Sequence, residues 1–135
     1  MELVGFSILD RLYGLHSRYV NRVIECTRLF PAPFMPECHK GLLFYRGDLY
    51  DVIDVGILFS RKASAKEPPY RIILLKWELK KLAIIPDVVI GLVSLDDPSV
   101  KQEASRVNGQ PIDLITPDSL WDQLLKLSYG PGKIL

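Results

Sequence analysis

A segment near the middle of the chain, residues 60–69 (SRKASAKEPP), most constrains the fold because it separates two halves that repeat one pattern. Small, charged and proline residues without apolar periodicity are typical of a linker. On both sides, short apolar runs broken by turn residues follow in the same order. The sequence therefore predicts one domain over residues 1–135, with subdomain one at about 1–59, a linker at 60–69 and subdomain two at about 70–129.

The N-terminal half contains runs of apolar residues that predict β-strands. They lie at residues 3–9, 12–15, 41–45 and 48–55. One or two helical turns are expected at 17–23, and three prolines then forbid regular structure until the third run. Only Arg46 and Gly47 separate the last two runs, which is the spacing of a tight hairpin.

The C-terminal half repeats this order, with strands expected at 71–76, 82–85, 91–95 and 111–115. A short helical segment is expected to open at Asp87. The pair Asn108 and Gly109 is the strongest two-residue turn signal and predicts a second hairpin. A helix should close the half, because Thr116 fits an N-cap, Pro117 fits the first helical position, and an apolar stripe follows.

Two mostly β units of this size should pack together, because a domain of about 60 residues buries only about 60% of its unfolded surface. Short strands and frequent turns favour small closed barrels over an open sheet, since closure removes exposed strand edges. The predicted fold class is therefore mostly β, with two small barrels, short helices and a C-terminal helix.

The composition is that of an ordinary globular protein, with 48% apolar and 24% charged residues and a net charge of +1. The first residues lack a basic, apolar leader, and two cysteines are too few for a disulfide framework. The apolar stretch at 82–95 is interrupted by Pro86 and Asp87 and is shorter than the roughly 20 residues that span a bilayer. We expect a cytoplasmic protein with reduced thiols and no direct membrane insertion.

No catalytic residue is expected. Asp51 and Asp54 are the obvious carboxylate pair, but side chains three residues apart in a strand point to opposite faces. Each should cap a strand end, border a loop or form an ion pair. The nucleophile elbow and both phosphate-binding glycine motifs are absent from the sequence, which argues against hydrolytic and nucleotide chemistry and predicts no cofactor.

A metal site would have to use His16, Cys26, Cys38 and His39, the number of ligands in a structural zinc site. The spacing argues against one, because no C-x-x-C pair occurs and two of the four residues are adjacent. We expect buried cysteines and surface histidines instead, with no metal.

Nucleic acid is a weaker possibility, since small β-barrels with aromatic and basic residues can bind oligonucleotides. The candidate residues are Arg18, Tyr19, Arg22, Arg28, Phe30, Phe44, Tyr45 and Arg46. Because the chain has no basic excess and several aromatics fall at core positions, this reading ranks third.

The Arg46-Gly47 turn carries the most information about a partner. Two-residue hairpin turns need a positive φ at the first position, so an arginine there would carry a backbone cost. An arginine at a hairpin tip is well placed to reach another protein. The residues alone leave open whether it does so or is merely exposed.

The N-terminal half resembles the CheW-like family. Residues 4–25 (VGFSILDRLYGLHSRYVNRVIE) are similar to its opening strand, Tyr-Gly pair and short helix. Residues 40–55 (KGLLFYRGDLYDVIDV) are similar to its segment of Gly, apolar residues, Asn-Leu-Arg-Gly and a strand-closing aspartate.

The C-terminal half continues the resemblance over residues 71–95 and 109–125 (GQPIDLITPDSLWDQLL). It implies two SH3-like five-stranded β-barrel subdomains and a non-enzymatic adaptor. The implied partners are a chemosensory histidine kinase, through its CheA-like regulatory domain, and the cytoplasmic tip of a chemoreceptor. The segment between residues 95 and 106 is shorter than in the family, so the second barrel is expected to be trimmed.

The resemblance also implies protein-binding positions, which are Val20, Arg22, Gly41, Phe44, Tyr45, Arg46 and Gly47. Asp54 matches the strand-closing aspartate. Three of these residues depart from the family pattern: Phe44 replaces asparagine, Tyr45 replaces leucine, and Arg22 replaces a usually acidic residue. Such departures favour, as an alternative, a diverged module that scaffolds another two-component or motility pathway.

Overall fold

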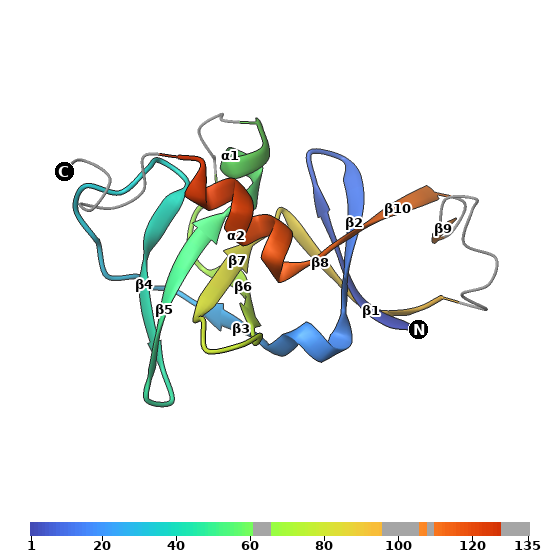
Figure 1. Ribbon diagram of the computed structural model, residues 1–135, viewed down its shortest axis with the longest axis horizontal. Coiled ribbons are helices and arrows are strands. Elements are labelled where there is room, and N and C mark those ends of the chain that lie inside the picture. The colour runs from blue at the N-terminus through green and yellow to red at the C-terminus, as the bar shows by residue number, and fades with distance from the viewer. Residues whose placement is uncertain (61–65, 96–105, 108–109, 128–135) are drawn as a thin grey trace.

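The computed structural model describes residues 1–60, 66–95, 106–107 and 110–127, and its strands form two five-stranded sheets (Figure 1). We call them the first and the second sheet. Three short helices accompany them: the 3₁₀ turn η1 (Ser17–Tyr19), α1 (Val55–Ser60) and α2 (Pro117–Leu125). Within these described residues, no helix is long and apolar enough to cross a membrane.

The first sheet has the strand order β8-β1-β2-β10-β9. Its strands are β1 (Glu2–Ile8), β2 (Arg11–His16), β8 (Val88–Ser94), β9 (Arg106–Val107) and β10 (Gln110–Ile115). Strand β10 runs parallel to β2, whereas β8 and β2 flank β1 in antiparallel pairs.

The second sheet has the strand order β3-β6-β7-β5-β4. Its strands are β3 (Val20–Cys26), β4 (His39–Tyr45), β5 (Asp48–Asp54), β6 (Tyr70–Leu75) and β7 (Leu82–Ile85). The chain that leaves β3 returns against β4, because Phe30 and Leu42 exchange two backbone hydrogen bonds of 2.9 and 2.7 Å. This bridge links the two edges of the sheet and bends it towards a barrel.

The expected division into halves is wrong as an assignment of strands. Each sheet takes strands from both sides of residues 60–69. The strands before and after these residues, β5 and β6, both belong to the second sheet, so the expected linker does not separate two subdomains. The reason is long-range pairing: β10 lies parallel to β2 and β7 lies parallel to β5. A local pattern of strands and turns carries no information about such pairs.

Two expected helical segments are also corrected. Only Ser17–Tyr19 is helical within 17–23, and Val20 already begins β3. The segment after Asp87 is strand β8. Both strands are rich in valine and isoleucine, whose branched side chains favour an extended backbone.

The C-terminal helix is confirmed. Thr116 is its N-cap, with a capping box to Ser119, and Pro117 stands at the start of the helix. The Asn108-Gly109 turn lies outside the described residues, although Val107 and Gln110 on either side of it pair in antiparallel register.

Buried apolar residues form three clusters. The largest lies between the sheets and combines residues of both sheets with α1 and α2, among them Phe6, Leu15, Ile84 and Leu120. A second cluster fills the second sheet, and a small third one fills the first sheet. Because the largest cluster is shared, the two sheets stabilise each other.

Candidate interaction surface

One end of the second sheet collects segments that are distant in sequence. Strand β3 begins there, β6 ends and β7 begins there, and the β4–β5 hairpin projects beyond them (Figure 1). The register places Val20 opposite Leu75 and Leu82 opposite Asp51. We define residues 17–22, 44–49 and 76–82 as the hairpin rim.

The tip of the hairpin has the left-handed backbone that the sequence predicts. Arg46 has a φ of 49° and Gly47 a φ of 88°, which is the pattern of a tight two-residue turn. Arginine adopts this region at a cost, because its Cβ crowds the backbone there. The guanidinium lies 5.3 Å from the ring centroid of Tyr45.

The strands beside the tip display two large apolar side chains. Phe44 is 63% exposed and Leu49 is 52% exposed, and the two residues stand opposite each other in the β4–β5 ladder. Tyr45 is only half-buried and packs against the cluster inside the second sheet. Of the two predicted aromatic contacts, Phe44 is therefore the one that reaches outward.

Val20 and Arg22 lie on the same rim but at the start of β3, at the other edge of the strand order. Val20 is half-buried and packs against the cluster between the sheets, whereas Arg22 is exposed beside an irregularity in the β3–β6 register. Between them, the Asn21 side chain donates a hydrogen bond of 3.2 Å to the hydroxyl of Tyr50 in β5. The rim thus unites all the predicted contact residues except Gly41.

Gly41 lies at the opposite end of β4 and has a structural task. Its φ is 143°, and a Cβ atom at this position would stand 2.7 Å from the carbonyl oxygen of Phe30. Glycine is required because the chain after β3 passes directly over it. The contact that it permits is the bridge between Phe30 and Leu42.

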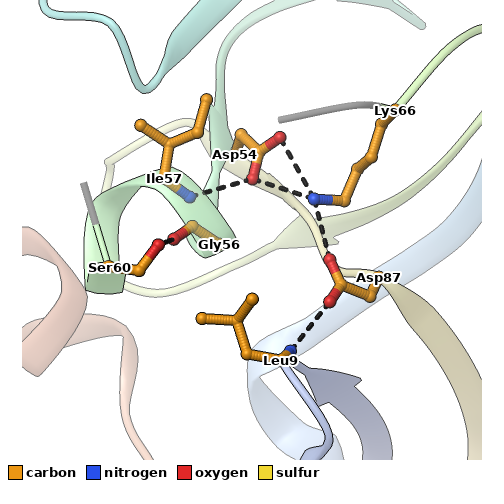
Figure 2. A network of polar contacts seen from close by, with 7 residues as sticks. All are labelled: Leu9, Asp54, Gly56, Ile57, Ser60, Lys66 and Asp87. Atoms are coloured by element: carbon orange, nitrogen blue, oxygen red, sulfur yellow. Dashed lines mark hydrogen bonds and ion pairs between the residues drawn. The ribbon is translucent and has the colours of Figure 1, made fainter. Parts of the chain in front are cut away.

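A polar network that the sequence did not reveal joins the two sheets (Figure 2). Asp54, fully buried at the end of β5, accepts hydrogen bonds from the amide of Ile57 and from Nζ of Lys66, at 3.2 and 3.1 Å. The same ammonium lies 2.8 Å from Asp87. Asp87 in turn accepts a hydrogen bond of 2.8 Å from the amide of Leu9, in the turn between β1 and β2.

The charges in this network stabilise one another. Burial alone would raise the pKa of Asp87, but the Leu9 amide and the Lys66 ammonium outweigh it and hold that pKa below its ordinary value. Burial would lower the pKa of Lys66, but Asp87 and Asp54 outweigh it and raise that pKa. Only the strand-closing position of Asp54 was visible in the sequence; Lys66 is one of several charged residues of the predicted linker, and nothing in the sequence marked it as a partner of the two aspartates.

Residues 2–120 match the family model described as the CheW-like domain. This chain belongs to the CheW-like family. It is similar to the crystal structure of the scaffolding protein TtCheW from Thermoanaerobacter tengcongensis, with a TM-score of 0.71 and 26% sequence identity. That similarity covers 84% of this chain and 87% of the other. A comparison with curated proteins found no match.

The CheW-like fold confirms the predicted class, mostly β with two sheets, short helices and a closing helix. CheW-like scaffolding proteins are non-enzymatic, and the chain is a scaffolding domain of chemotaxis signalling.

The remaining chemical candidates have structural tasks in this CheW-like domain. Asp51 and Asp54 point to opposite sides as predicted: Asp51 lies 2.9 Å from Nε2 of His39, whereas Asp54 binds Lys66. The expected surface position of His39 is wrong, because its side chain is 1% exposed. In the part of the chain that the structure describes, no group of three potential metal ligands occurs.

Proposed function

We propose that this CheW-like chain is an adaptor that couples a chemosensory histidine kinase to the cytoplasmic tip of a chemoreceptor. The family supplies the general scaffolding role. The observation that supports a specific docking role is the projecting β4–β5 hairpin, which exposes Phe44 and Leu49 beside an arginine held in a costly backbone conformation. Such outliers persist mainly where the surrounding structure or function demands them.

The hairpin is suited to a modest signalling interface. A few anchors carry most of the energy in such interfaces, and aromatic residues and arginine are enriched among them. Phe44 and Arg46 supply both kinds of side chain at this hairpin. We propose that the kinase regulatory domain binds to this rim. We propose that the helical receptor tip binds on the outside of the molecule, where the two sheets meet.

The test is the affinity for a purified CheA-like regulatory domain, measured by titration calorimetry. Phe44→Ala and Arg46→Ala should each weaken binding by about tenfold or more while the unfolding temperature stays almost unchanged. Arg71→Ala is the matched control, because Arg71 is exposed at the other end of the same sheet. Equal losses of binding and stability would make Arg46 structural instead.

The second candidate is a diverged module that scaffolds another two-component or motility pathway. Phe44 and Arg22 favour it, because both departures from the family pattern stand exposed on the rim. In that case the wild-type chain binds neither the chemosensory kinase domain nor a receptor tip, yet the rim variants still lose binding to the actual partner.

A further inference from the structure

The turn between β6 and β7 displays the most exposed large apolar side chain among the described residues. Leu79 is 93% exposed, at the tip of a turn in which Trp77 and Lys80 form a bridge. Its sequence surroundings, a short charged stretch, had suggested no more than a break between strands. At this exposure, Leu79 contributes almost no packing to the isolated domain.

This turn packs against the C-terminal helix α2. Trp77 is buried, and its ring meets that of Trp121 in α2 edge-on at a centroid distance of 6.2 Å. The indole Nε1 of Trp77 donates a hydrogen bond of 3.0 Å to Asp118, and Nζ of Lys80 lies 5.7 Å from both indole rings. Glu78, beside the leucine, has a φ of 53°. These contacts on both sides of Glu78 support its left-handed backbone and place Leu79 at the tip of a well-packed turn.

The turn is continuous with the hairpin. The amide of Asp51 donates a hydrogen bond of 3.1 Å to the carbonyl of Lys81, and Nζ of Lys81 lies 3.7 Å from Asp48 beside the hairpin tip. Leu79, Phe44 and Leu49 are therefore three exposed apolar residues of one rim.

The rim is also the positively charged part of the molecule. Its basic residues are Arg18, Arg22, Arg46, Lys76, Lys80 and Lys81, and its acidic residues are Asp48 and Glu78. These six basic and two acidic residues give the rim four net positive charges, whereas the whole chain has +1. The rest of the chain is thus net negative, and charge complementarity points to an acidic partner surface at the rim.

We propose that Leu79 is a second anchor of the rim and inserts into an apolar socket of a partner protein, a socket bordered by carboxylates. The proposal rests on the proposed docking role of the rim and adds the chemistry of the partner face. A protein fits better than single-stranded nucleic acid, because the two indole rings at this site pack against each other and Lys80 instead of offering a free stacking face.

The test compares Leu79→Ala, Leu79→Met and Lys76→Glu with the wild-type chain in calorimetric titrations against the kinase regulatory domain. Leu79→Ala should weaken binding by about tenfold. Leu79→Met should retain most of the wild-type affinity, because methionine has nearly the same volume as leucine. Lys76→Glu, which reverses an exposed charge, should weaken binding several-fold at low salt and much less at high salt. The unfolding temperature should stay unchanged in all three.

Two results separate this inference from the proposed function. If Phe44→Ala weakens kinase binding and Leu79→Ala does not, the anchor is overturned and the adaptor role stands. If the wild-type chain binds no kinase domain, a photo-crosslinking residue at position 79 decides, with position 125 as the control on α2. A crosslinked protein supports the anchor only if, once purified, it binds the wild-type chain and loses affinity for Leu79→Ala; absence of a crosslink specific to position 79 overturns it.

Nucleic acid is checked in the same series with a fluorescent single-stranded oligonucleotide of about 20 nucleotides. Binding that Lys76→Glu abolishes and Leu79→Ala leaves intact would overturn the protein socket and favour the oligonucleotide reading.

Discussion

Single residues show where sequence and structure agree most closely. The two-residue spacing at Arg46 and Gly47 predicted a tight turn with a strained arginine, and both φ angles are positive. Hairpin geometry depends on neighbours in the chain, so local reasoning finds it. Lys66 shows the opposite case, because its partners lie 12 and 21 positions away in sequence and only the folded chain brings them to its ammonium.

Asp87→Asn should reduce stability in a pH-dependent way. The folded-state pKa of Asp87 is held below its unfolded value, so its contribution is present above pH about 4 and is lost as the pH falls through the folded pKa. Because the carboxylate is about one-third exposed, the loss near neutral pH should be about 1 kcal/mol or less. Urea unfolding at several pH values measures it.

The difference in unfolding free energy between wild type and Asp87→Asn should shrink as the pH falls below about 4. Lys66 contributes in the same neutral window, because its folded pKa is raised: its contribution is fully present below its ordinary pKa of 10.5 and is lost only as the pH rises through the higher folded pKa. A difference that stays constant down to pH 2 would mean that the carboxylate charge contributes nothing.

At the scale of elements, most strands, the helical turn at Ser17–Tyr19 and the last helix were predictable, whereas strand β3, the start of β8 and helix α1 were not. The helix α2 carries its own signals, a capping threonine, a proline and an apolar stripe, so its start was found from the sequence. The segments after Tyr19 and after Asp87 have weaker local signals, and the pairing of β3 with β6 and of β8 with β1 decides their extended form.

Gly41→Ala should destabilise the protein more than Gly47→Ala. Both glycines have a positive φ, but only at Gly41 would a Cβ collide with a neighbouring backbone, the carbonyl of Phe30; at Gly47 nothing lies within 4 Å. We expect a loss of about 2 kcal/mol or more for the first and about 1 kcal/mol for the second. Thermal and urea unfolding of the pair give the comparison, and equal losses would contradict the close approach of the chain over Gly41.

At the scale of the whole molecule, the fold class was predictable and the division of the chain was not. The repeated pattern around residues 60–69 suggested two halves that each build a subdomain. The structure interleaves them instead: β6 and β7 complete the second sheet, and β8, β9 and β10 complete the first. The candidate site shows the same difference between local and long-range information. The hairpin was predicted from its own residues, whereas the position of Leu79 beside the hairpin depends on the pairing of strands distant in sequence.

Neither half should fold alone. A fragment of residues 1–59 lacks β6, β7, β8 and β10, so both of its sheets would be incomplete and the shared cluster would be exposed. We expect the circular dichroism spectra of fragments 1–59 and 70–135 to be those of unfolded chains when each fragment is measured separately. Cooperative unfolding of fragment 1–59 by itself would show that the halves are independent.

The proposed adaptor role is tested most directly by sedimentation velocity of three purified components: this chain, a CheA-like regulatory domain and a soluble chemoreceptor tip fragment. The kinase domain and the receptor tip should co-sediment only when the chain is present, and Arg46→Ala should release the kinase domain while the receptor tip stays bound. A chain that binds neither component, or that binds them only in competition, would contradict the account.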